Sequence, residues 1–172
     1  MATQAHGADG VASSGGLSPI KGLVVLAVVV VVVAAFIAIS LAVGLATFSG
    51  GFLFVFYYTG VCHAAPDKFV PAALGAFVGL ALAYALVALP AAFGGAGMAV
   101  ALILLLAAVY ALIMGWAAVA INHAAMLFLT VAAIPALHQT ATIAEMALSA
   151  GLAMVLIGVV LGAVRMRGLT TA

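Results

Sequence analysis

Charged residues are almost missing from this chain of 172 residues: 4% are charged and 70% are hydrophobic. Soluble domains carry about 25% charged residues, so the composition argues against a soluble fold. The intervals 22–66 and 69–144 hold no Asp, Glu, Lys or Arg. Because each interval exceeds the roughly 20 apolar residues that cross a bilayer core, we expect each to cross more than once.

Cysteine is scarce as well, since the chain has one cysteine and a formal net charge of +1. A single cysteine excludes an intramolecular disulfide and argues against a cysteine-based zinc site. The small net charge leaves no basic patch for nucleic acid. Cys62 and His63 are adjacent, and adjacent side chains diverge on a helix, so no nucleophile stands beside a base. We therefore expect no metal, no cofactor, no nucleic-acid partner and no enzymatic activity.

What the chain does contain is a series of apolar segments separated by glycine, proline and polar residues. They predict an all-α integral membrane protein with six transmembrane helices, two of them short. Residues 1–20 are small and polar and predict a disordered N-terminal tail. Residues 21–167 form the six-helix transmembrane domain, and residues 168–172 a C-terminal tail. The expected helices cover residues 21–46, 51–64, 68–89, 98–116, 122–137 and 143–164, with a turn over residues 90–97.

The order long, short, long occurs twice along the chain and predicts a 3+3 inverted repeat. His63 and His138 stand near the ends of the two short helices, the second and the fifth. Short hydrophobic segments are tolerated at membrane depth where they line a cavity, so these two helices are the expected lining of a path. Glycines four residues apart would let neighbouring helices approach closely: Gly75 and Gly79, and Gly158 and Gly162.

Several polar residues on or near the short helices are candidates to contact a solute: Tyr57, Tyr58, His63, Asn122, His123, His138 and Glu145. An ionisable group such as His63 is functional at membrane depth but needs no role at the interface. Glu145 forms a capping box with Thr142, or it pairs with His138 at an outer mouth and makes entry sensitive to pH. The aromatic residues 52–58 serve as interfacial packing or as a surface on which a solute stacks.

The few cations give an orientation, because cytoplasmic flanks carry the excess of Lys and Arg. With six crossings, all four fall on one side: Lys21, Lys68, Arg165 and Arg167. We therefore expect a multi-pass protein of the bacterial inner membrane with both termini in the cytoplasm, where Lys68 anchors the third helix. Asp67 would cap the same helix. Since a chain of this length builds only a thin wall, we also expect a homo-oligomer in the lipid bilayer.

Two passages carry a family resemblance: residues 48–60 read FSGGFLFVFYYTG, and residues 121–130 read INHAAMLFLT, ahead of a glycine-spaced last helix. They resemble a family of short bacterial inner-membrane proteins of unknown function. More distantly, the pattern is similar to the membrane domain of the fusaric-acid-resistance and aromatic-acid-exporter group. The resemblance covers about residues 22–165 and implies movement of a small solute.

Two functions therefore remain open. The first is a membrane channel or secondary transporter for a small solute, with a path lined by the second and fifth helices. The second is a non-transporting assembly or scaffold subunit that docks partners through its glycine-rich helix faces, with every polar residue serving as a cap or an anchor.

Overall fold

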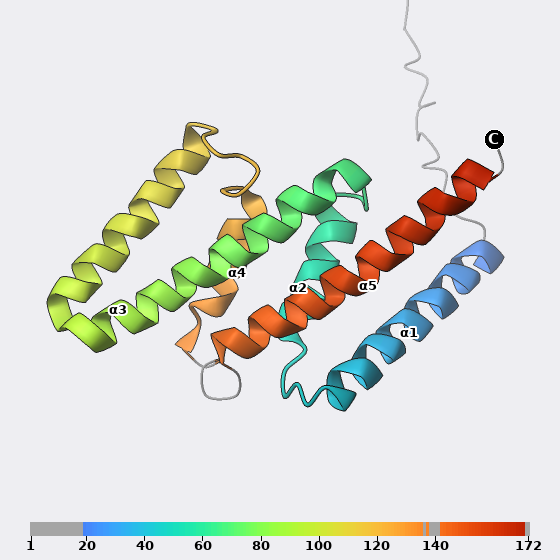
Figure 1. Cartoon of the computed structure of the whole chain (residues 1–172), viewed down its shortest axis with the longest axis horizontal. Helices are drawn as coiled ribbons and strands as arrows, with labels where there is room; N and C mark the ends of the chain where they lie inside the picture. Colours follow the sequence, from blue (N-terminus) through green and yellow to red (C-terminus); the bar gives the residue numbers. More distant parts are fainter. Residues whose placement is uncertain (1–18, 136, 138–141, 171–172) are drawn as a thin grey trace, which may run out of the picture. The chain divides into compact units, whose positions relative to one another are not determined.

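The computed structural model describes residues 19–135, 137 and 142–170, and within them the chain is helical, without strands. The all-α prediction is confirmed for these residues. The chain divides into two compact units, Met1–Ala35 and Phe36–Ala172. Helix α1 (Pro19–Ala42) begins in the first unit and ends in the second, and the other helices belong to the second unit, to which the following description applies (Figure 1).

Most of the two predicted tails lies outside the described residues, namely residues 1–18 and 171–172. Helix α5 (Ile143–Thr170) continues through residues 168–170, the first part of the predicted C-terminal tail. No proline and no polar run precedes Thr170 to stop the helix.

Helix α3 (Pro66–Ile113) folds back on itself at Gly94, whose φ of 58° and ψ of −134° suit a residue without a side chain (Figure 1). We call residues 66–93 the first arm and residues 95–113 the second arm. Gly97 lets the arms meet closely, because a Cβ there would coincide with the backbone carbonyl of Leu89. The reversal falls within the turn predicted for residues 90–97, although Pro90 itself lies inside the helix.

Six membrane crossings are not supported by the described residues. Two of their helices have the length and hydropathy to cross a bilayer, namely α3 and the part of α5 over Ile143–Ala163. Two of the other predicted spans are short, because the second and fifth predicted helices have 8 and 10 α-helical residues. The first predicted span corresponds to α1, which has 24 residues. The third and fourth predicted helices are not counted as separate spans, because they are the two arms of the single helix α3.

The two predicted short helices are present in nearly the expected places. The first is α2 (Ser49–Phe56), which continues as a π-helix, η1 (Tyr57–Val61). The second is α4 (His123–Ala132), which ends five residues before the predicted residue 137. Their buried residues join those of α3 and α5 in one hydrophobic core, so both short helices are packed within the protein.

Helix α2 packs against α5. Its residues Gly50 and Gly51 leave no room for a side chain, since a Cβ on either would fall on the backbone carbonyl of Met146 or on the ring of Phe36. The backbone N–H of Gly51 donates to Ser149 Oγ at 3.0 Å. This N–H is one of the free donors in the first turn of α2, so α5 supplies the cap that α2 lacks in its own sequence.

Helix α4 packs against the first arm of α3 in a similar way. A Cβ on Gly79 would fall on the backbone carbonyl of Ala125, and a Cβ on Gly75 would fall on the side chain of Asn122. Gly75 and Gly79 thus lie where α4 approaches the first arm closely. Each short helix therefore lies against a long helix from the other half of the chain.

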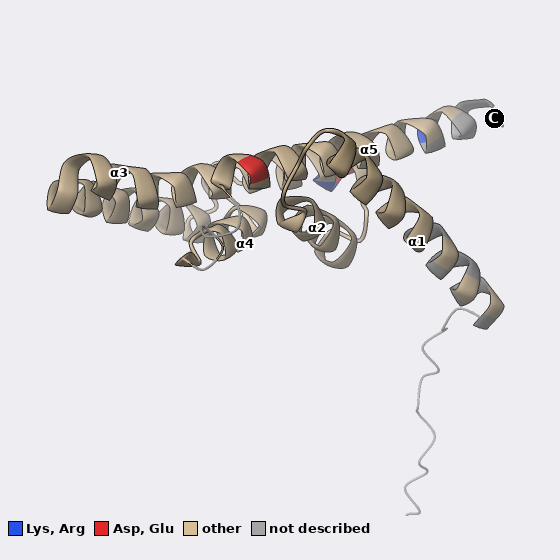
Figure 2. Ribbon diagram, turned by 90° about the horizontal axis from the view of Figure 1, so that it is seen from below, with Lys and Arg blue, Asp and Glu red and all other residues tan. Residues whose placement is uncertain are grey.

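Gly158 and Gly162 make no comparable approach. A Cβ on Gly158 would lie 3.8 Å from the ring of Phe69, and a Cβ on Gly162 would meet nothing within 4 Å. Within the described residues, the close helix contact predicted for this pair is therefore not formed. Charged side chains are sparse along all these helices (Figure 2).

Candidate functional site

A cavity of about 350 Å³ lies between η1, the beginning of the first arm and the segment that leads into α4. We call it the polar pocket. Nine residues line it: Tyr57, Cys62, Lys68, Pro71, Ala72, Ala118, Val119, Asn122 and His123. It brings together three of the residues predicted to contact a solute, and it adds Cys62 and Lys68.

Asn122 shapes one wall of the polar pocket through five hydrogen bonds of its side chain. Its Oδ1 accepts hydrogen bonds from the backbone N–H groups of Ala124 and Ala125, at 2.9 and 3.3 Å, and so caps α4. Its Nδ2 donates to the carbonyl oxygen of Pro71 at 2.8 Å and lies 3.2–3.3 Å from two carbonyls of the preceding turn. The amide is therefore used within the fold, next to His123 in the sequence.

The π-helix positions Tyr57 and Cys62. In η1 the backbone N–H of Cys62 donates to the carbonyl of Tyr57 at 3.1 Å, a bond that spans five residues instead of four. The wider turn sets the Tyr57 hydroxyl beside the Cys62 side chain and the backbone of Ala124. His63 and Ala64 then take positive φ values of 52° and 54°, which turn the chain toward α3.

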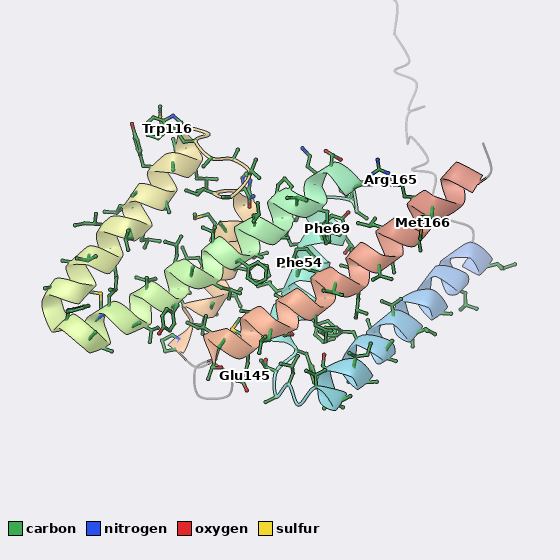
Figure 3. All side chains as sticks on the ribbon, viewed as in Figure 1. Phe54, Phe69, Trp116, Glu145, Arg165 and Met166 are labelled. Atoms are coloured by element: carbon green, nitrogen blue, oxygen red, sulfur yellow. The ribbon has the colours of Figure 1, made fainter. Side chains whose placement is uncertain are left out.

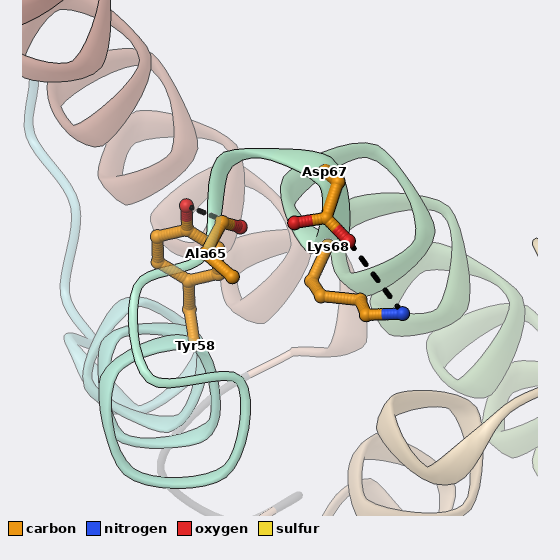
Figure 4. Close-up of polar contacts among 4 residues, drawn as sticks. All are labelled: Tyr58, Ala65, Asp67 and Lys68. Carbon is orange, nitrogen blue, oxygen red and sulfur yellow. Dashed lines mark hydrogen bonds and ion pairs between the residues drawn. The ribbon is translucent and has the colours of Figure 1, made fainter.

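Lys68 was predicted to be a topology anchor, and it also lines the polar pocket. Its Nζ lies 3.6 Å from Asp67 Oδ2, and both side chains are largely exposed (Figure 4). The prediction that Asp67 caps this helix is wrong, because Ala65 occupies the N-cap position without a side-chain bond. Asp67 stands in the first turn, where its charge still faces the positive end of the helix dipole.

Tyr58 was predicted to contact a solute, but it is buried in an aromatic cluster. Its ring stacks on Phe54 at 6.0 Å between centroids and meets Phe69 edge-on at 5.5 Å. Its hydroxyl donates to the carbonyl of Ala65 at 3.0 Å (Figure 4). The labelled rings of Phe54 and Phe69 lie together between their helices (Figure 3), so this part of the aromatic run is packing.

The remaining predicted residues lie away from the polar pocket or outside the described residues. His63 is exposed on the turn after η1 and does not line the pocket. His138 lies outside the described residues. Glu145 forms the predicted capping box: Thr142 N–H donates to Glu145 Oε2 at 2.8 Å, and Glu145 N–H donates to Thr142 Oγ1 at 3.2 Å. Figure 3 places Glu145 at the beginning of α5 and Arg165 toward its other end.

A larger cavity of about 520 Å³ lies between the first arm and the beginning of α5, and we call it the apolar cleft. Nine residues line it: Phe77, Leu80, Ala81, Tyr84, Val87, Thr142, Ile143, Ala144 and Ala147. Only a phenol and one hydroxyl among these side chains can form a hydrogen bond.

Chemically, the polar pocket offers an ammonium, an imidazole, a phenol and a thiol against walls of proline, alanine and valine. These groups can bind the polar end of a small solute while the walls contact its apolar part. No group of three or more His, Cys, Asp or Glu residues in the described ranges could hold a metal ion.

The sequence does contain a local signal for Lys68. The residue lies a few positions after Cys62 and His63 and directly after Asp67, in the one short stretch that combines a thiol, an imidazole and charges. Its proximity to Asn122 depends on the packing of α4 against α3 and has no local signal. Comparison of the chain with protein-family models, with curated proteins and with solved structures finds no match.

Proposed function

We propose that this chain is a multi-pass membrane protein that carries a small solute as a channel or secondary transporter, and that the polar pocket contacts the solute. The observation that carries the proposal is the pocket itself. It gathers five hydrogen-bonding side chains in a chain of which 4% is charged. Polar groups are costly among apolar helices and are kept where they contact a solute or an ion.

The exposure of the long helices supports a membrane setting. The most apolar windows of α3 and α5 are only 17% and 28% buried inside the molecule, whereas the core helix of a soluble protein is mostly buried. Water would disfavour such a surface, and lipid accepts it. At 1.5 Å per residue the two arms of α3 rise about 42 and about 28 Å, near the roughly 30 Å of a bilayer core.

These lengths favour an arrangement of four long helices that shelter two short ones. The long helices are α1, the two arms of α3, and α5; the short ones are α2 with η1, and α4. The resulting order, long, short, long in each half, is the basis of the proposed 3+3 inverted repeat.

We also propose that both termini face the cytoplasm of a bacterial cell. Lys68 adjoins Phe69, whose ring lies near Gly158 on α5, two turns before Arg165. These cations therefore lie toward one end of the second unit, with Glu145 at the other end of α5, as expected where positive charge stays inside. A homo-oligomer would complete the wall around the path.

Flux into liposomes that contain the purified full-length chain tests the proposal. The panel should include small neutral, cationic and anionic solutes, with empty liposomes as the reference. We expect flux of at least one solute above the reference, and a several-fold loss in the His123→Ala and Lys68→Ala variants. His63→Ala is the matched control, because it removes an exposed histidine that does not line the polar pocket.

The proposal fails if every solute in the panel enters no faster than in empty liposomes. It also fails in its assignment of the site if His63→Ala reduces flux as strongly as His123→Ala does.

The open face of α5 at Gly162 favours the second candidate, a scaffold subunit that docks a partner helix. A Gly162→Leu variant would then lose a complex that blue-native electrophoresis of the membranes detects, while no solute flux would be found for any variant. Retention of the complex in Gly162→Leu would remove this candidate.

A further inference from the structure

The buried residues of the first short helix recur 74 residues later in the second. The buried residues Gly50, Gly51 and Phe54 of α2 correspond to the buried residues Ala124, Ala125 and Phe128 of α4. The same offset relates the buried face of the first arm to that of α5, with these pairs: Ala72 and Met146, Gly75 and Ser149, Ala76 and Ala150, Gly79 and Ala153, Leu80 and Met154. One offset for two separate sets of helices points to two copies of one three-helix unit.

The first arm and α5 cross where the two copies meet. The two helices run in opposite directions (Figure 1), so a two-fold axis between them passes midway between a residue and its own equivalent. Phe77 and Gly151 are such a pair, and the ring of Phe77 lies 3.8 Å from the position of a Cβ on Gly151. The axis of the repeat therefore passes close to this contact.

The two ends of the interface between the first arm and α5 are packed differently, although the repeat makes them equivalent. At one end the ring of Phe69 lies 3.8 Å from a Cβ position on Gly158 and packs on the aromatic cluster. With the same offset, Phe69 is equivalent to Ile143, and Gly158 is equivalent to Tyr84. These two residues line the apolar cleft, so one end of the interface is filled and the other is open.

We infer that the first arm and α5 rock about the contact between Phe77 and Gly151, and that the rocking exchanges which end of their interface is open. Two equivalent halves have a second arrangement with the ends interchanged, and small side chains at the crossing allow the helices to tilt. Inverted repeats present a site alternately to the two sides of a membrane by this type of motion. The inference rests on the proposed function for its purpose, but the motion itself requires no solute.

Spin-label distances in the full-length chain test the motion, in lipid nanodiscs and in a Cys62→Ser background. One label pair at Val87 and Ala144 spans the apolar cleft, and the equivalent pair at Val70 and Leu161 spans the filled end. We expect the two labels to be far apart in most molecules at the apolar cleft. At the filled end we expect them to be close together in most molecules.

A Gly158→Leu variant should reverse these populations, because the larger side chain pushes Phe69 away and props that end open. The distance between Val70 and Leu161 should then lengthen while that between Val87 and Ala144 shortens. Gly158→Val, whose side chain is smaller than leucine but extends beyond the methyl group that fits at 3.8 Å from Phe69, should shift both distances in the same directions by less. Gly95→Leu is the matched control, because no described residue lies within 4 Å of its Cβ position.

The inference is overturned if Gly158→Leu and Gly158→Val lengthen the distance between Val70 and Leu161 without shortening that between Val87 and Ala144, or if neither variant changes either distance. If Gly158→Leu loses its helical circular dichroism, the distances in Gly158→Val decide. Reciprocal distance changes without flux of any solute would retain the rocking motion and reject transport, so the two proposals fail separately.

Discussion

The side-chain amide of Asn122 donates a hydrogen bond to the carbonyl oxygen of Pro71, with 2.8 Å between Nδ2 and O, across 51 residues of sequence. The same side chain caps α4 through Oδ1. It reaches the helix because residue 75, one turn after Pro71, is a glycine and leaves space for the amide. One residue thus closes the free end of a short helix and joins that helix to the first arm of α3.

Two substitutions of Asn122 distinguish its cap on α4 from its hydrogen bond to Pro71. Asn122→Ala removes both the cap and the bond to Pro71, and should lower the free energy of unfolding by about 1–3 kcal/mol. Asn122→Ser keeps a capping oxygen but cannot reach Pro71, so its stability should lie between those of the wild type and Asn122→Ala. Unfolding of the full chain in mixed micelles by increasing sodium dodecyl sulfate, followed by circular dichroism, measures the series. Equal stability of Asn122→Ser and Asn122→Ala would contradict a capping role.

Adding a methyl group at Gly75 should disrupt the same contact. A Cβ there overlaps the Asn122 side chain, and overpacking of this kind costs about 1–3 kcal/mol. Gly95→Ala, in the same helix but with open space around it, should be neutral or more stable by up to about 1 kcal/mol. In an Asn122→Ser background, the cost of Gly75→Ala should fall, because the overlapping atoms are gone. An undiminished cost would show that the clash involves other atoms.

Two fully buried serines should respond differently to alanine. Ser149 Oγ accepts the N–H of Gly51, so Ser149→Ala leaves a buried donor without a partner and should cost about 1–3 kcal/mol. Ser40 Oγ has no hydrogen-bond partner among the described residues, so Ser40→Ala should leave stability unchanged or raise it. The same micelle titration compares the two variants. A larger loss for Ser40→Ala than for Ser149→Ala would reverse the expected order.

A thiol reagent can modify the polar pocket at one position, since Cys62 is the only cysteine and lines that cavity. A bulky maleimide on its sulfur should fill much of the roughly 350 Å³ and reduce solute flux several-fold. The Cys62→Ser variant should show the same flux before and after the reagent, whatever its own rate. Labelling confirmed by mass spectrometry without a change in flux would place the path elsewhere.

The local features of this fold could be predicted from the sequence. The hydroxyl and carboxylate of Thr142 and Glu145 form the expected capping box, and a reversal at Gly94 lies inside the expected turn. The positions of both short helices follow from the glycine, proline and polar residues around them. Each of these features depends on residues that are close together in the sequence, so the sequence alone is enough to predict it.

Contacts between distant segments could not be predicted in the same way. Lys68 and His123 share a pocket because α4 packs on the first arm, and Tyr58 is buried because Phe69 returns to cover it. The glycine pairs at residues 75 and 79 and at residues 158 and 162 have the same spacing, yet among the described residues only the first pair meets another helix closely. Spacing shows where a close approach is allowed, and the partner is decided by the rest of the fold.

The reversal of α3 at Gly94 decides the topology of everything after it. Without that reversal, residues 66–113 would form one rod of about 72 Å at 1.5 Å per residue, more than twice the thickness of a bilayer core. The positive φ of Gly94 instead accompanies a hairpin of two shorter helices. In the multi-pass arrangement that we propose, this glycine therefore decides on which side of the membrane the C-terminal half of the chain begins.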